Sequence, residues 1–138
     1  MTRQLMFEKK IGIPEGSWSY EQDLGFDFVI EDTSLRYDLT LEVAHAGDYG
    51  FQNLYVQFHT SYPSIETKTQ MVSLELANKT GIWNGACSGN SCVVEIPLQT
   101  NATFEEAGKH SISIEQFMRK NPLRGVESMR LKIAPSEL

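Results

Sequence analysis

The sequence has no uninterrupted apolar run that approaches the roughly 20 residues needed to cross a bilayer. Residues 1–7 also lack the apolar segment and small-residue cleavage site of a secretory signal. The chain is therefore either cytoplasmic or a mature region whose leader has been replaced by a start methionine. The sequence alone leaves both interpretations open.

Positive charge is scarce as well. Twelve basic residues stand against eighteen acidic ones, which gives a formal net charge of −6. The densest basic groups are Lys9–Lys10 and the set Arg119, Lys120 and Arg124. Because a phosphate backbone requires clustered Lys and Arg, we exclude nucleic acid as the partner.

The recurrent enzyme motifs are missing too. The chain has no His-Glu-x-x-His, no Gly-x-Ser-x-Gly and no glycine loop that would cradle a phosphate. Its three histidines are scattered at positions 45, 59 and 110, and only two cysteines could join them around a metal ion. We expect no enzyme and no cofactor.

Apolar residues recur with a period of two in segment after segment, which is typical of half-buried β-strands. The alternating segments are 26–31, 37–43, 54–58, 72–76, 94–98, 111–115 and 129–133, with a less regular one at 6–13. About eight short strands separated by turn residues predict a single all-β domain over residues 1–138. The expected fold is an antiparallel β-sandwich with jelly-roll topology.

Two segments carry more specific expectations. Residues 26–31 end in a continuous apolar run, which favours a strand near the centre of a sheet. Residues 114–120 are the only stretch in which we expect a helical turn, and this turn would place Glu115 and Arg119 side by side. Such a pair would either project as a contact for a partner protein or form a salt bridge within a buried chain reversal. In the second case Met118 and Leu123 would be core residues.

Several motifs, in a consistent order, resemble the gliding-motility lipoprotein family GldH. Residues 114–119 read Ile-Glu-Gln-Phe-Met-Arg and are followed by Pro122-Leu123 and Gly125, as in the family's closing segment. Residues 13–18 match its opening "I-P-x-G-x-W". Residues 47–55 and 76–85 resemble its "D-Y-P-Y-S-N-L" and "L-A-D-x-x-G-K-W-x-G" segments, although Gly50 and Phe51 replace Pro and Tyr.

The resemblance implies a lipoprotein anchored to the outer membrane and facing the periplasm. It also implies a role in gliding, through envelope proteins of a machine linked to type IX secretion. The lipid anchor would sit on a leader cysteine that is absent here. Neither Cys87 nor Cys92 can replace it, because both are expected deep inside the domain. The family carries no catalytic residues.

Cys87 and Cys92 flank four turn-forming residues, between two segments of strand pattern. Facing positions of a hairpin lie within disulfide range, and an oxidising periplasm favours the bond. A disulfide is the preferred interpretation, ahead of free thiols and of a metal site.

The expected contact surface is a set of turns, because loops on a rigid sandwich commonly carry binding. These candidate docking residues are Asp48, Tyr49, Phe51, Asn53, Arg119, Pro122, Leu123 and Gly125.

The alternative is a carbohydrate-binding module of a surface protein. Its platform would use aromatic residues, which more often pack in a core or at its rim. They are Trp18, Tyr20, Tyr49, Phe51, Tyr55, Tyr62 and Trp83.

Overall fold

The computed structural model describes residues 4–64 and 67–137, and β-strands dominate it. In this part of the chain eleven strands and one short 3-10 helix follow one another. They are β1 (Phe7–Gly12), η1 (Pro14–Gly16), β2 (Ser17–Trp18), β3 (Leu24–Ile30), β4 (Tyr37–Ala46), β5 (Asn53–Ser61), β6 (Thr67–Glu75), β7 (Ala86–Ser88), β8 (Ser91–Ala102), β9 (Gly108–Gln116), β10 (Leu123–Arg124) and β11 (Val126–Pro135).

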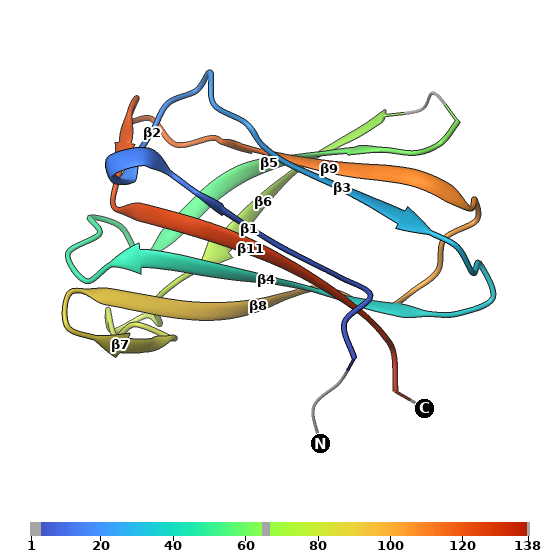
Figure 1. Ribbon diagram of the computed structural model, residues 1–138. Coiled ribbons are helices and arrows are strands. Elements are labelled where there is room, and N and C mark those ends of the chain that lie inside the picture. The colour runs from blue at the N-terminus through green and yellow to red at the C-terminus, as the bar shows by residue number, and fades with distance from the viewer. Residues whose placement is uncertain (1–3, 65–66, 138) are drawn as a thin grey trace.

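Two antiparallel sheets form the layers of the sandwich (Figure 1). One has the strand order β1-β11-β4-β8-β7 and the other has the order β3-β9-β5-β6. When only the eight long strands are counted in chain order, the sheets read 1-8-3-6 and 2-7-4-5. This alternation between layers is the jelly-roll arrangement, so the predicted fold is confirmed.

Alternation along each strand explains why these segments pair as they do. Burial along β4 switches with every residue, and along β3 it switches between fully buried and exposed. One flank of each sheet therefore faces the other sheet, where burial of apolar surface supplies the main stabilisation. The largest fully buried side chains on these inner faces include Phe26, Leu41, Leu54, Ile114 and Leu131.

Two local expectations were wrong. β3 is an edge strand, paired only with β9, and Val29 is 53% exposed because it points to the outer face. Residues 114–120 form no helix, because β9 continues to Gln116 and an irregular turn follows it. The two-residue strands β2 and β10 were not predicted, since two residues show no periodicity, whereas β7 forms the first arm of the hairpin expected around Cys87 and Cys92.

Gly85 explains the close packing of the "W-x-G" segment. A methyl group at Gly85 would overlap the carbonyl oxygen of Val93 on β8, because the chain crosses that strand without room for a side chain. The preceding turn is closed by Asn78, whose Oδ1 accepts hydrogen bonds from the backbone N–H groups of Thr80 and Ile82. Glycine is thus required at position 85 because the backbone there lies directly against the backbone of Val93.

We predict that Gly85→Ala lowers the free energy of unfolding by about 1–3 kcal/mol, the usual cost of overpacking. Gly50→Ala is the matched control, since nothing lies within 4 Å of its added methyl group. It should change stability by no more than about 0.5 kcal/mol. Urea unfolding of both variants measures the difference, and equal midpoints would contradict the crossing.

Candidate functional site

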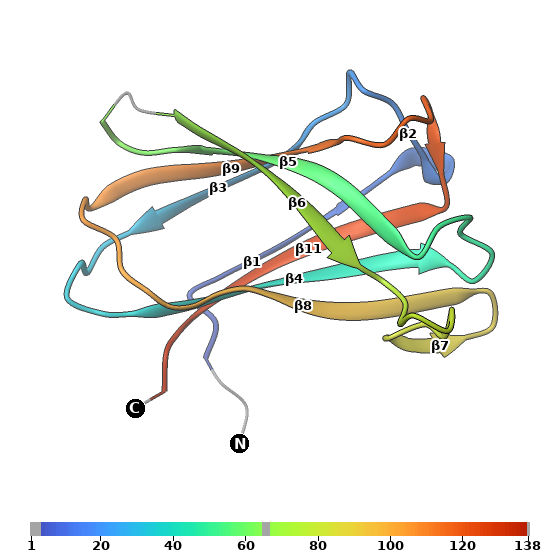
Figure 2. The ribbon, with the colours of Figure 1, turned by 180° about the vertical axis from the view of Figure 1, so that it is seen from behind.

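The predicted docking turns lie together at one end of the sandwich. Residues 47–52 connect β4 to β5, and residues 117–122 connect β9 to β10. Both turns lie at the left in Figure 1 and at the right in Figure 2, whereas the two chain ends leave the opposite end. The structure therefore brings together two segments that are about 70 residues apart in the sequence.

Tyr49 and Gly125 join these two turns. Gly125 has a φ of +106°, and a methyl group added to it would lie 3.0 Å from Cδ1 of the Tyr49 ring. Its carbonyl oxygen accepts a hydrogen bond of 2.7 Å from the backbone N–H of Ala46, where β4 ends. The Tyr49 hydroxyl donates to the carbonyl oxygen of Asn53 at 2.9 Å. Burial of the ring raises the pKa of the Tyr49 phenol well above its usual range.

Gln116 holds the turn that follows β9. This side chain is buried, and its Nε2 donates to the carbonyl oxygens of Lys120 at 2.8 Å and Trp18 at 3.3 Å. Its Oε1 accepts a hydrogen bond of 2.8 Å from the backbone N–H of Met118. One amide thus satisfies three backbone groups, which explains a glutamine at this position of the motif.

The buried side chain of Met118 also holds this turn in place. Its side chain is almost fully buried, and its sulfur lies 3.3 Å from the backbone nitrogen of Tyr55, which is the donor. The hydroxyl of Tyr20 donates to the Met118 carbonyl oxygen at 2.6 Å. The peptide bond between Asn121 and Pro122 is cis. The predicted core positions of Met118 and Leu123 are confirmed.

The eight candidate docking residues divide into two groups. Asp48, Phe51, Arg119 and Pro122 are exposed. Tyr49 and Leu123 are buried, so a direct contact role for these two is corrected to one of support. Asn53 and Gly125 are half-buried, and the Asn53 amide donates to the Ser73 hydroxyl at 3.0 Å.

Three exposed aromatic residues, Tyr20, Tyr55 and Phe117, lie beside these turns; sequence reasoning weighed the two tyrosines only for a carbohydrate platform and missed Phe117. Phe117 donates its backbone N–H to the carbonyl oxygen of Tyr55 at 2.8 Å, so the two residues are neighbours. Tyr20 contacts Met118 from the other side. All three side chains are more than a third exposed. We define the turn surface as the exposed set Tyr20, Asp48, Phe51, Tyr55, Phe117, Arg119 and Pro122.

The expected pair of Glu115 and Arg119 does not form. Glu115 lies on β9, and its Oε1 is 2.9 Å from Nε2 of His59 on the neighbouring strand β5. His59 is held from the other side by the hydroxyl of Thr69 at 2.9 Å. Arg119 is exposed in the turn and belongs to the turn surface.

Cys87 and Cys92 are joined by a disulfide in the β7–β8 hairpin, where they face each other with their Cα atoms 4.0 Å apart. The hairpin lies at the same end of the sandwich as the turns (Figure 2). Nearby, the indole of Trp83 donates to the carbonyl oxygen of Gly47 at 3.2 Å. Its ring contacts that of the buried His45 at a centroid distance of 4.5 Å. This end is therefore cross-linked through side chains as well as through strands.

The outer face of the five-stranded sheet carries an ion-pair network. Arg130 on β11 lies 2.9 Å from Glu8 and 3.5 Å from Glu42, and Lys132 lies 3.6 Å from Glu42. Glu95 accepts a hydrogen bond from Lys132, and this bond is the main cause that raises the pKa of the lysine. Charges paired across the four strands β1, β11, β4 and β8 are typical of a surface in contact with water.

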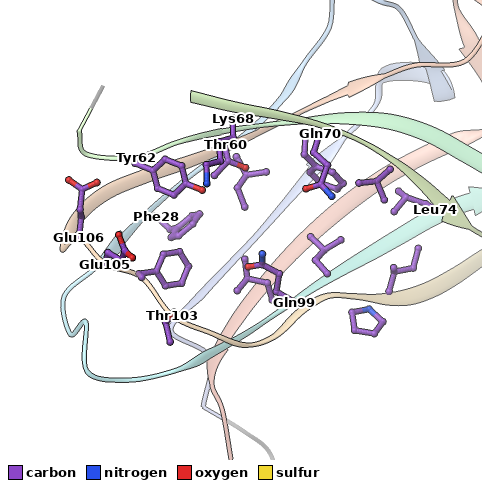
Figure 3. A pocket seen from close by; sticks show the side chains of 18 of the residues that line it. Phe28, Thr60, Tyr62, Lys68, Gln70, Leu74, Gln99, Thr103, Glu105 and Glu106 are labelled. Carbon is purple, nitrogen blue, oxygen red and sulfur yellow. The ribbon is translucent and has the colours of Figure 1, made fainter. Parts of the chain in front are cut away.

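A cleft opens between the sheets along the opposing edges of β6 and β8 (Figure 3). Its volume is about 790 Å³, and its floor is formed by core residues such as Leu39, Phe58 and Ile112. Gln70 and Gln99 lie on opposite walls. The polar rim also includes Thr60, Tyr62, Lys68, Thr103, Glu105 and Glu106.

The seven aromatic residues weighed as a carbohydrate platform do not share one surface. Trp18 and Tyr49 are buried, and Tyr62 lines the cleft between the sheets. Tyr55 is exposed on the polar face of its strand, as expected. Within residues 4–64 and 67–137 no group of three or more His, Cys, Asp or Glu side chains could hold a metal ion. The same residues contain no helix long and apolar enough to span a membrane.

We predict that Gln116→Leu destabilises the protein by about 2–4 kcal/mol, because it leaves two carbonyl groups and one N–H without a partner. Gln70→Leu is the control, since this glutamine is exposed at the cleft rim. Thermal unfolding followed by circular dichroism measures both. Equal midpoints would show that Gln116 does not hold the turn.

Comparison with known proteins agrees with the motifs. The sequence model of the GldH lipoprotein family matches residues 5–133. The chain is 24% identical over 127 residues to a gliding motility lipoprotein GldH homolog of Christiangramia forsetii, which covers 87% of this chain and 78% of that protein. It is 25% identical over 114 residues to the gliding motility lipoprotein GldH of Flavobacterium johnsoniae, which covers 82% and 70%.

Among solved structures, a family GH115 4-O-methyl-α-glucuronidase with specificity for decorated arabinogalactans contains a similar fold. The superposition has a TM-score of 0.51 at 11% identity and covers 99% of this chain but only 18% of that enzyme. At this identity the likeness concerns the fold alone. The family match, by contrast, extends over nearly the whole sequence and includes both turns described above. The chain therefore belongs to the GldH lipoprotein family.

Proposed function

We propose that this chain is a non-enzymatic, lipid-anchored domain at the outer membrane that faces the periplasm and supports gliding motility. It does so by docking to envelope proteins of the machinery linked to type IX secretion. Family membership supports the motility role and the lipoprotein character. The turn surface supports the docking role.

One observation carries this proposal. Phe117 and Arg119 are exposed on a turn whose backbone is fixed by the buried amide of Gln116, and the exposed residues Tyr20 and Tyr55 are hydrogen-bonded to this turn. Aromatic residues and arginine are the side chains most enriched at the centres of protein interfaces. A preorganised turn also loses little conformational entropy when a partner binds.

The position of the turn surface supports the same conclusion. It lies at the end of the sandwich opposite to the chain ends (Figure 1). A domain tethered through its N-terminus would therefore present these turns away from the membrane, where a periplasmic partner can reach them.

The test combines Phe117→Ala with Arg119→Ala in the native host. Because hot-spot residues each contribute about 2 kcal/mol or more, we expect co-purification of secretion-machinery proteins to fall at least about tenfold and spreading on agar to be reduced. The control is Met71→Ala with Lys109→Ala, which removes one exposed apolar and one exposed basic side chain from the outer face of the four-stranded sheet. Unchanged co-purification in the first variant, with an unchanged melting temperature, would refute docking through these turns.

A second candidate function is glycan binding in the cleft between β6 and β8. Opposed amides, hydroxyl groups and the ring of Tyr62 above an apolar floor suit a neutral oligosaccharide. Affinity electrophoresis in polysaccharide gels tests this function. Retardation that is lost in Gln70→Ala with Gln99→Ala would support it, and equal mobility in all gels would refute it.

A further inference from the structure

The end of the sandwich where the chain begins and ends carries its own exposed apolar patch. Leu5 and Met6 precede β1, Val29 lies near the end of β3, and Leu35 lies in the turn before β4. Val29 is 53% exposed and Leu35 is 42% exposed. We define these four side chains as the terminal patch.

A shallow hollow unites most of this patch. Met6, Val29 and Leu35 line a cavity of about 420 Å³ together with Phe7, Tyr37 and Pro135. The backbone N–H of Met6 donates to the carbonyl oxygen of Ile133 at 2.7 Å, which fixes this residue beside the last strand. The four side chains of the patch thus come from three segments that the fold brings together.

We propose that the terminal patch rests on the lipid surface into which the anchor of this lipoprotein inserts. The inference rests on the anchored function proposed above. The described chain begins at Gln4, immediately beside the patch, so an anchor on the N-terminal side brings this end closest to the bilayer (Figures 1 and 2). A contiguous apolar patch at that position can lie among lipid headgroups, which adds a second contact to the anchor.

The charges around the patch define the kind of lipid surface. Glu31 and Asp32 also line the hollow, and Arg36 is exposed nearby. The Asp32 carboxylate accepts hydrogen bonds from the hydroxyl and backbone N–H of Ser34, and these bonds lower its pKa. Because Glu31 and Asp32 would repel anionic headgroups, the contact that we expect is made by the apolar side chains of the patch. We therefore expect it on neutral vesicles and at high salt.

The test holds the full chain on vesicles of phosphatidylcholine and phosphatidylethanolamine by an N-terminal histidine tag and a small fraction of nickel-chelating lipid. Amide hydrogen exchange is compared between tethered and free protein. We expect exchange in residues 29–36 to slow at least threefold on the vesicle, at both 0.1 M and 0.5 M salt, and exchange in residues 47–52 to stay unchanged.

Two double variants make the result specific. Val29→Ser with Leu35→Ser should abolish the slowing. Met71→Ser with Ile82→Ser removes two side chains that are 56% and 65% exposed outside the patch, and should preserve it. The proposal is overturned if residues 29–36 exchange equally in both states, if protection appears at the turns instead, or if both double variants behave alike. No partner protein takes part, so failure here is distinguishable from failure of docking through the turn surface.

Discussion

The ring of Tyr49, in the turn between β4 and β5, lies against the backbone of Gly125, which is between β10 and β11. This contact lies at the end of the sandwich opposite the chain ends. Only glycine fits there, because its φ is positive and a methyl group would press on the ring. The hydrogen bond from Ala46 to Gly125 extends the contact into the end of β4. The junction adds to the β5–β9 pairing and to the hydrogen bond from Phe117 to Tyr55, which also hold the segment after β9 against β5.

Gln116 orders the neighbouring turn that follows β9. Its buried amide shapes residues 117–120, so the exposed side chains Phe117 and Arg119 project from a turn that is already ordered. The motif residues of the family are mostly of this supporting kind, since Gln116, Met118, Leu123, Gly125 and Gly85 all act through packing or backbone geometry. In this chain the motif residues therefore determine the shape of this end of the molecule.

Alternation of apolar residues was enough to predict the eight long strands and their packing into two layers, because each strand buries one flank only. It could not show which strands lie at sheet edges. Val29 was misplaced for this reason, since an apolar residue on an outer face looks the same in sequence as one in the core. The cleft between β6 and β8 was missed for the same reason, because it exists only where two edges face each other.

The candidate site was predictable in its location but not in its division of roles. The density of motifs identified residues 48–53 and 119–125, yet whether a turn residue points inward depends on the strand across from it. Leu123 is buried where β10 pairs with β2, opposite Trp18, and Tyr49 is buried against Gly125. Phe117 is exposed because it falls on the outer face of the alternation that runs along β9.

The most direct measurement of the central claim is a nuclear Overhauser spectrum of the folded chain. Close contact of the Tyr49 ring with Gly125 predicts cross-peaks between the ring protons and the Gly125 α-protons, with one α-proton shifted upfield by the ring. Random-coil shifts for Gly125 and no cross-peak to Tyr49 would contradict the account.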